Sequence, residues 1–458
     1  MATWRPEEGD AALYAASALF AGVTAGFSSI ALYRQWGELA VGPYVAAALA
    51  SLIVGRFRAH RREVALASGG PTPIERHWGT ARIVIFVAIL FGATLLPLSL
   101  EVHWRAEGGN PSAHVQPETV VIEHSGQRAA DGKDPYYALF HDGHVEHATP
   151  GEPAYESFDP YLPLMTIFGL PSSTREPIRL TDARIFFTIA TLLVVAVALA
   201  LCRGPSERKA RTLQVLTVLP TAALPLATGG DDMPVAALLL LAMVLAQRRR
   251  PGWAGFTLGV VSAMKFTAWP LAGLALFAAR DRAGRRAPGR MALGMLVVTV
   301  PVVLPFLIRG PHEFIQNVVL FPLGLVGVPS PAASPLPGHL IVSAYPHLHR
   351  ILPITVAIIG LAVLVRRLVR RPPSTASEVC TLGGWVMTVA ILFAPATRVG
   401  YLLYPINFFV WGYLLRGSEE ADESQASTAA PVMASVPGDP ETLATGDASP
   451  VPPVDAGS

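Results

Sequence analysis

The sequence predicts an all-α, polytopic integral membrane protein, and three observations support this prediction. Hydrophobic residues make up 52% of the 458 residues, charged residues only 15%, and apolar runs of spanning length recur along the chain. A soluble domain of this size carries about 25% charged residues, so much of the apolar surface must face lipid. One helix crosses a bilayer core with about 20 apolar residues, which is the length of most of these runs.

Apolar segments predict roughly twelve membrane-spanning helices. Residues 252–280 are too long for one span and short for two, so we expect a tight helical hairpin turning around Lys265–Pro270. The stretch 161–171 is flanked by prolines and is expected to be a re-entrant or interfacial helix rather than a span. The remaining spans are expected near residues 11–32, 38–55, 80–100, 182–202, 212–228, 233–247, 291–309, 351–366, 377–395 and 401–415.

Arginine clusters set the expected orientation, because cytoplasmic loops carry an excess of Lys and Arg. Placing every cluster in the cytoplasm fits one topology in the cell membrane, with both termini inside. The loop 101–181, the turn Thr228–Asp232 and the loop 310–350 then lie outside. The clusters are Arg56–Arg62, Arg203–Arg211, Arg248–Arg250, Arg280–Arg290 and Arg366–Arg371.

Three regions are expected along the chain. Residues 1–79 form an N-terminal transmembrane hairpin and a cytoplasmic loop, residues 80–416 the transmembrane core, and residues 417–458 a disordered cytoplasmic tail poor in large apolar residues. The net charge of +2 and the lack of a basic groove with interleaved aromatics exclude nucleic acid as a partner. Phosphate-binding glycine loops and the HExxH zinc motif are also missing from the sequence.

The long outer loop holds the first candidate site. Pro117 and Gly132 are placed as the first residue and the terminator of a short helix. Glu118 and Glu123 are five residues apart on it, about 140° around the axis, so only one of them can face a small site. An amphipathic helix with solvated charges is the alternative interpretation.

Polar residues at the outer ends of apolar segments give further candidates, because charges near a membrane are costly unless they are paired or used. Asp231 and Asp232 begin a helix, where a carboxylate can also act as a simple cap. Lys265 lies in an apolar hairpin, where it can hold a phosphate or merely extend to the interface. Tyr161 starts an apolar stretch and can serve as an aromatic anchor.

These groups, in this order, resemble the family 87 glycosyltransferases, the polyprenyl-phosphate-mannose-dependent branch of the GT-C membrane enzymes. The resemblance covers about residues 80–415. The matching motifs are Gly132-Lys133-Asp134-Pro135-Tyr136, Tyr161-Leu162-Pro163-Leu164, the polar turn from Gly229 to Pro234, and Ala254-Gly255-Phe256-Thr257-Leu258-Gly259 leading to Lys265.

The resemblance implies a GT-C-like helical bundle, a polyprenyl-phosphate sugar as donor substrate with no cofactor or metal, and an inverting transfer outside the membrane. It also implies a loop aspartate as general base. That position falls on Glu118 here, so the chain departs from the family pattern, and Glu123 or Asp134 remains an alternative base. A carboxylate of either length can act as the base if it reaches the acceptor hydroxyl.

The expected reaction moves a hexose such as mannose to a lipid or glycan acceptor in the membrane. Lys265 and Arg128 are expected to meet the phosphate, Asp231 and Asp232 to hold sugar hydroxyls, and Tyr136 and Tyr161 to line the substrate site. Two alternatives are a transporter or flippase, which would show inverted repeats and midplane charges, and a non-catalytic relative that has lost its base.

Overall fold

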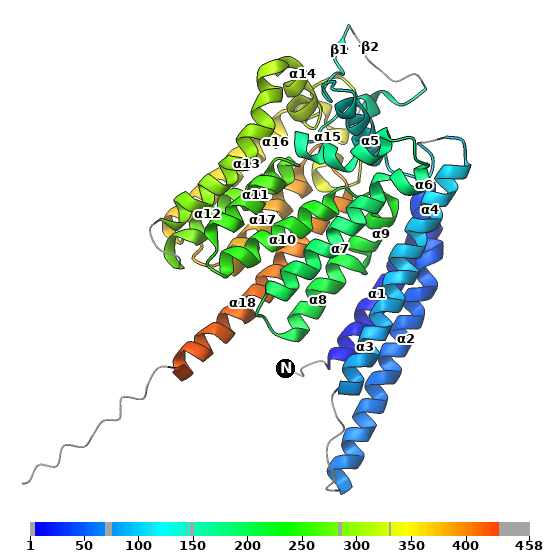
Figure 1. The fold of residues 1–458 in the computed structure, drawn as a ribbon, viewed down its shortest axis with the longest axis vertical. Helices are drawn as coiled ribbons and strands as arrows, with labels where there is room; N and C mark the ends of the chain where they lie inside the picture. The colour runs from blue at the N-terminus through cyan, green and yellow to red at the C-terminus, as the bar shows by residue number, and fades with distance from the viewer. Residues whose placement is uncertain are drawn as a thin grey trace, which may run out of the picture.

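The computed structural model describes residues 5–68, 76–110, 112–142, 144–146, 151–282, 286–328 and 331–429. Almost every element within these residues is helical, which confirms the expected all-α fold. The only two strands in this part of the chain, β1 (Phe140–His141) and β2 (His144–Val145), pair antiparallel. Long helices run side by side, and short elements gather at one end, the upper end in Figure 1.

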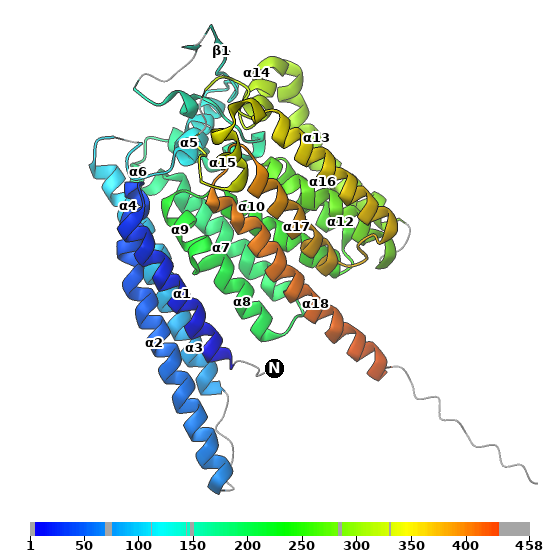
Figure 2. The ribbon, with the colours of Figure 1, turned by 180° about the vertical axis from the view of Figure 1, so that it is seen from behind.

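A hairpin of two long helices and a third, broken helix form one edge of the molecule (Figures 1 and 2). Gly37 lets the hairpin helices approach closely, because a Cβ there would lie 2.6 Å from the carbonyl oxygen of Ala21. The indole Nε1 of Trp36 donates to the carbonyl of Ala93 at 3.0 Å, which ties the hairpin to the broken helix. The elements are α1 (Pro6–Phe27), α2 (Ala31–Ser68), α3 (Arg76–Ile89), the π-helical turn η1 (Leu90–Leu95) and α4 (Leu96–Glu107).

The main bundle is built around one helix, α10 (Asp232–Gln247). Most residues of α10 are buried, as expected for a helix that is apolar on all sides. In contrast, α16 (Ile351–Arg370) has no fully buried residue, and most of its surface is available to lipid, although Leu364 and Leu368 pack against the core. The other helices of the bundle are α7 (Ala183–Leu201), α8 (Ser206–Thr217), α9 (Pro220–Thr228), α11 (Pro251–Ser262), the 3-10 turn η5 (Phe266–Ala268), α12 (Trp269–Arg282), α13 (Ala287–Arg309), α17 (Ala376–Phe393) and α18 (Leu403–Ala429).

Among the described residues, seven helical segments are long and apolar enough to cross a membrane. They make the chain a polytopic membrane protein, but the expected count of roughly twelve spans is not confirmed. The expected span 212–228 is split into α8 and α9, and Pro220 is the first residue of α9, where its missing N–H leaves no helical hydrogen bond unmade. Segment 252–280 forms α11 and α12, of 12 and 14 residues, on either side of Lys265. At about 1.5 Å per residue, each piece is shorter than the ~30 Å bilayer core.

The short elements lie between the long helices at the upper end of Figure 1. The expected helix from Pro117 is present and ends at Ala130, followed by Gly132 with a positive φ of 72°. Residues 161–171 form 3-10 turns and, as expected, no span. The short elements are α5 (Pro117–Ala130), η2 (Ala154–Ser157), η3 (Pro163–Phe168), η4 (Leu170–Ser173), α6 (Ile178–Thr181), α14 (Pro311–Ile315), the π-helical turn η6 (Gln316–Leu320), α15 (Pro337–Ala344), η7 (Pro346–Leu348) and η8 (Val399–Leu402).

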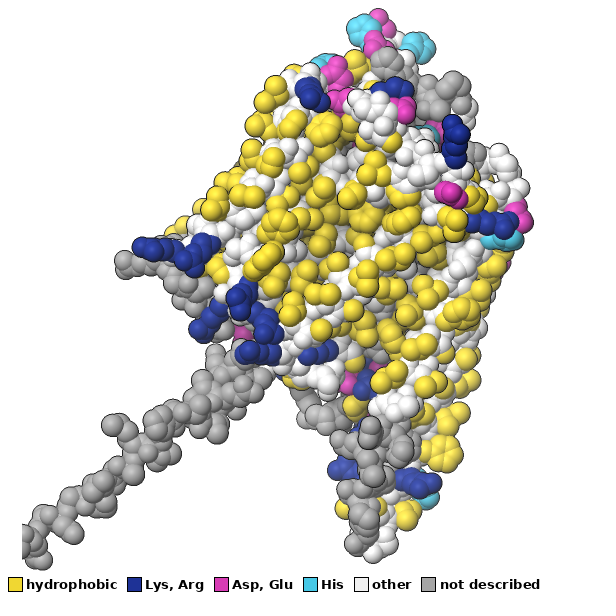
Figure 3. All heavy atoms as spheres, viewed as in Figure 1, with side chains coloured by type: hydrophobic (Ala, Val, Ile, Leu, Met, Phe, Trp, Pro, Cys, Tyr) yellow, Lys and Arg dark blue, Asp and Glu magenta, His cyan; other side chains and the backbone are white. Residues whose placement is uncertain are grey.

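Charge is distributed unevenly between the two ends of the molecule. In Figure 3 apolar side chains cover the middle of the face, and most Lys and Arg side chains of that face gather at the lower end. Asp, Glu and His side chains gather instead at the end that carries the short elements. Helix α18 continues past the expected boundary at 417 to Ala429, and the rest of the expected tail lies outside the described residues.

Candidate functional site

Lys265 is the centre of a buried charge cluster. Its Nζ lies 2.7 Å from Asp231 Oδ2 and 2.6 Å from Asp232 Oδ1, and all three residues are at most 9% exposed. A buried ammonium needs such counterions, because desolvating a lone charge is very costly. The structure therefore brings together the three residues that the sequence analysis placed in two separate motifs.

Two tyrosines complete this cluster: Tyr401 in η8 and Tyr404 at the start of α18. The hydroxyl of Tyr404 donates to Asp232 Oδ1 at 2.5 Å and accepts from Thr267 Oγ1 at 2.7 Å. The ring of Tyr401 lies 5.8 Å from Lys265 Nζ. Sequence analysis missed both tyrosines, since they lie more than 130 positions beyond Lys265 in the chain and no local pattern marks them.

The 160s segment is docked directly on the end of α11. The backbone N–H groups of Leu162 and Leu164 donate to the carbonyls of Met264 and Ala263 at 3.0 and 2.9 Å. This places the ring of Tyr161 5.2 Å from Lys265 Nζ, within range of a cation–π contact. Tyr161 is thus positioned by backbone pairing at the charge cluster.

Helix α5 begins beside the same cluster. The backbone N–H of Gln116 donates to the carbonyl of Thr228 at 2.9 Å, and Thr119 Oγ1 donates to Gly229 at 3.4 Å. Gly229 has φ 123°, and a Cβ there would lie 2.2 Å from Thr119 Oγ1, so only glycine permits this approach.

Glu118, in the first turn of α5, is paired with Arg398. The ion pair involves Glu118 Oε1, whereas Glu118 Oε2 is buried and has no hydrogen-bond partner among the described residues. Glu118 also interacts electrostatically with Asp231 and with the Tyr401 side chain. A buried carboxylate oxygen without a donor is rare in native proteins and calls for a functional explanation.

Arg398 was not among the expected site residues. One signal was available: Arg398 lies between the expected spans 377–395 and 401–415, in a turn that the expected topology places outside, away from the arginine clusters expected in the cytoplasm. An isolated arginine on the outer side departs from the charge bias that set the topology.

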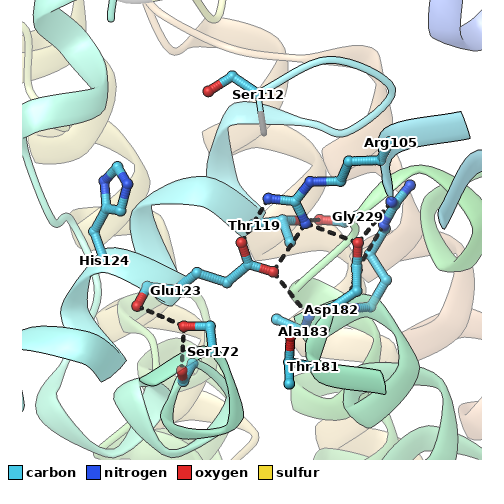
Figure 4. A network of polar contacts seen from close by, with 12 residues as sticks. Arg105, Ser112, Thr119, Glu123, His124, Ser172, Thr181, Asp182, Ala183 and Gly229 are labelled. Carbon is cyan, nitrogen blue, oxygen red and sulfur yellow. Dashed lines mark hydrogen bonds and ion pairs between the residues drawn. The ribbon is translucent and has the colours of Figure 1, made fainter. Parts of the chain in front are cut away.

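Glu123, one and a half turns along α5, has a different environment (Figure 4). Arg105 donates to both of its carboxylate oxygens, at 2.9 and 2.6 Å, and the backbone N–H of Ala183 donates to Oε1 at 3.0 Å. Arg105 also bonds Asp182 at 2.7 Å, and Asp182 bonds Arg184. We call Arg105, Glu123, Asp182 and Arg184 the loop clasp, because it joins the two ends of the long loop to α5.

A pair of glycines seats α5 against the 3-10 turns. A Cβ on Gly126 would lie 2.0 Å from the carbonyl carbon of Gly169, and one on Gly169 would lie 1.8 Å from the carbonyl oxygen of Ile122. Ser125 Oγ donates to Asp159 Oδ2 at 2.5 Å beside this contact. Burial raises the pKa of Asp159 from 3.8 to about 7. Helix α5 is therefore fixed along its length.

The remaining expected site residues lie at the far end of α5. Arg128 is ten residues from Glu118, about 15 Å along the helix. Its guanidinium stacks 3.8 Å above the ring of Tyr137, and its Nε donates to the carbonyl of Asp134 at 2.8 Å. The Asp134 carboxylate accepts from the backbone N–H of Tyr136 at 2.9 Å, and burial raises its pKa.

Tyr136 contributes to the charge cluster indirectly. Its hydroxyl donates to the carbonyl of Tyr161 at 2.8 Å, and its ring packs against Phe306 and Phe314. Tyr136 thus supports the segment that carries Tyr161. The structure groups Glu118, Tyr161, Asp231, Asp232 and Lys265, and it separates them from Glu123, Arg128 and Asp134.

The described residues include no group of three or more His, Cys, Asp or Glu side chains able to hold a metal ion. The charges at this site come from side chains: three carboxylates, one ammonium and one guanidinium. Such a set can accept a proton from a hydroxyl and can bind an anionic group.

Comparison with known proteins identifies the family. No curated protein and no solved structure matches the chain. The model of glycosyltransferase family 87 matches residues 160–395, just over half of the chain. Tyr161, Asp231, Asp232 and Lys265 lie within the match, whereas Glu118 and Arg398 lie outside it. The chain belongs to glycosyltransferase family 87 and is a membrane glycosyltransferase.

Proposed function

We propose that the enzyme transfers a hexose such as mannose from a polyprenyl-phosphate donor to a hydroxyl of a lipid or glycan acceptor, with inversion, on the extracytoplasmic side. One observation carries the proposal: beside the Lys265 cluster, Glu118 presents a buried carboxylate oxygen that has no hydrogen-bond partner in the described part of the chain. A base and a cation in one site are what transfer from a phosphate-linked sugar requires.

Glu118 acts as the general base. Arg398 holds Oε1, which leaves Oε2 as the atom that takes the proton from the acceptor hydroxyl. The acceptor oxygen forms a bond to the anomeric carbon as the bond from that carbon to the phosphate oxygen breaks. The polyprenyl monophosphate leaves with the electron pair of the broken bond.

Lys265 and Arg398 meet the leaving phosphate. Lysine has three N–H donors, and Asp231 and Asp232 use two of them, so one remains for a phosphate oxygen. The two carboxylates also hold Nζ in place and offer their other oxygens to hydroxyls of the donor sugar. Arg398 takes the role expected of Arg128, because Arg128 lies at the other end of α5.

The arginine distribution supports an extracytoplasmic site. Most Lys and Arg side chains of the face drawn in Figure 3 gather at the end opposite to the short elements. Because cytoplasmic loops carry an excess of positive charge, this distribution supports a site on the outer side of the plasma membrane and both termini on its cytoplasmic side. The polyprenyl chain lies between helices in the lipid phase.

Transfer is tested with the purified chain, labelled polyprenyl-phosphate sugars and a membrane lipid extract. We expect a labelled product with one of the donors and a large loss of product with Lys265→Gln. The Lys133→Gln variant is the control, because Lys133 is exposed and its ammonium pairs with the exposed Asp131. The proposal would be overturned if product formed only with nucleotide sugars as donors, or if no donor gave any product.

Sidedness is tested by labelling an introduced cysteine. Cys202 and Cys380 are both buried, so Asp142→Cys in the exposed β1–β2 turn supplies an accessible thiol. We expect an impermeant maleimide to label it in intact cells. Labelling only after the cells are opened would reverse the orientation.

A further inference from the structure

A second group of carboxylates adjoins Glu118. The short turn η2 (Ala154–Ser157) packs against α5, and it carries Glu156, with Glu152 just before it. Glu156 is 6% exposed. Glu118 and Glu152 both act electrostatically on Glu156, so the three carboxyl groups lie around one region.

These carboxyl groups share an unusual property. The Oε2 atoms of Glu118, Glu152 and Glu156 are all buried, and none has a hydrogen-bond partner among the described residues. Arg398 compensates part of this charge, because it pairs with Glu118. The imidazole of His124 lies 3.6 Å from Glu152. Burial, followed by the charges of Glu152 and Glu118, raises the pKa of Glu156 to about 7.

The lack of hydrogen-bond donors for these three Oε2 atoms indicates which kind of ligand would bind here. Three buried acceptor atoms without donors each carry a desolvation cost that a bound hydroxyl would remove. A sugar headgroup brings several O–H donors at the spacing of neighbouring ring carbons. A phosphate brings acceptor oxygens and negative charge, so it would meet repulsion here.

We infer that Glu152 and Glu156, together with Glu118, form an acceptor subsite that takes an uncharged, hydroxyl-rich sugar headgroup and disfavours an anionic one. This inference rests on the proposed function for the identity of Glu118 as base. All three residues precede residue 160, so this subsite lies outside the family-matched part of the chain. The residues that select the acceptor therefore lie in the outer loop, ahead of the family-matched range.

The first test measures binding without any donor. The full chain is placed in phosphatidylcholine nanodiscs, which keep sugar detergents away from the site. We expect dodecyl glucoside to raise its thermal unfolding midpoint and dodecyl phosphate at equal concentration to leave it unchanged. Glu156→Gln should weaken the glucoside affinity by about 3- to 10-fold, the worth of one hydrogen bond. Glu146→Gln is the matched control, because Glu146 is exposed in the same loop.

The second test uses transfer. Glucosyl-diacylglycerol and phosphatidylinositol are compared as acceptors, and we expect the uncharged lipid to be preferred. Glu156→Gln and Glu152→Gln should raise KM for that acceptor and leave KM for the donor unchanged. A general loss of structure would instead affect both KM values.

The two tests separate the two proposals. Selective glucoside binding with no transfer from any polyprenyl-phosphate donor would support the subsite and contradict the proposed reaction. Equal binding of glucoside and phosphate, or a Glu156→Gln variant with wild-type glucoside affinity and acceptor KM, would overturn the subsite even if transfer occurs.

Discussion

Glu118 and Glu123 lie on the same short helix, yet their surroundings differ in almost every respect. Glu123 receives three hydrogen bonds and belongs to the loop clasp. Glu118 forms an ion pair with Arg398 through Oε1, and no described residue donates a hydrogen bond to its Oε2. A fully satisfied buried carboxylate stabilises the fold, whereas an incompletely satisfied one is available to a substrate.

This contrast separates two roles that the sequence could only list together. Both residues were candidate bases, because both carboxylates precede Gly132 on one predicted helix. Their separation of about 140° around that helix sends one toward Arg398 and the other toward Arg105. The four experiments that follow test or sharpen this contrast, from the largest expected effect to the smallest.

Glu118→Gln should have the largest effect. Without a base the transfer rate should fall by about 10²- to 10⁴-fold. The unfolding midpoint should fall less than in Glu123→Gln, because the side chains of Arg398 and Glu118 keep 20% and 16% exposure and a solvated ion pair contributes less to stability. The rate is measured with saturating labelled donor. Asp131→Asn, an exposed carboxylate just beyond α5, serves as control. A fully active Glu118→Gln enzyme would remove Glu118 as the base.

Glu123→Gln should show the opposite pattern. Breaking a buried ion pair by removing one charge costs about 3–5 kcal/mol, so the unfolding midpoint should drop while the folded fraction keeps its turnover. Glu107→Gln is the matched control: its pair with Arg179 is exposed on both sides and contributes at most about 1 kcal/mol. Unchanged stability together with lost turnover would assign catalysis to Glu123 instead.

Gly126→Ala should affect both glutamates at once. The new Cβ would overlap Gly169, and overpacking of this kind costs about 1–3 kcal/mol. Because α5 must shift, both stability and transfer rate should decrease, in contrast to the separate effects of the two glutamate variants. Gly26→Ala, where nothing lies within 4 Å, should change neither quantity.

The smallest effect should come from Asp159, which supports α5 through Ser125. Its pKa is raised from 3.8 to about 7 by burial, so the folded state holds a proton that the unfolded state loses above pH 4. The stability from this proton is complete below about pH 4 and is lost as the pH rises to about 7. In the wild type, the unfolding midpoint should fall as the pH rises through this range. In Asp159→Asn this fall should be smaller, because asparagine has no proton to lose. The difference should be modest, because a buried carboxyl group stays protonated rather than bearing an unpaired charge. An unchanged pH profile would contradict the assignment.

Local features of the site were predictable from sequence. Pro117 and Gly132 correctly predicted the bounds of α5 to within two residues, because they act through the backbone at each end. The prolines around 161–171 correctly excluded a span there. The apolar runs predicted the membrane helices but not their interruptions, since Pro220 and the residues around Lys265 divide segments that are continuous in hydropathy.

Long-range pairing was not predictable. Arg398 meets Glu118, and Arg105 meets Glu123, only because the bundle brings distant segments together. Nothing in the local sequence of α5 indicates which carboxylate receives a complete set of donors. Charge type and helical spacing therefore limit the candidates to a few residues, and tertiary contacts decide among them.

The loop clasp also has a consequence for how the chain is assembled. Arg105 and Asp182 are 77 residues apart, so α5 cannot be fixed until the beginning of α7 has been synthesised. Arg398 follows only after most of the bundle, so the pair with Glu118 is among the last contacts available to a growing chain. The scaffold around Glu123 can thus close once α7 begins, whereas the base acquires its partner, and the enzyme its complete site, only after α17 has been synthesised.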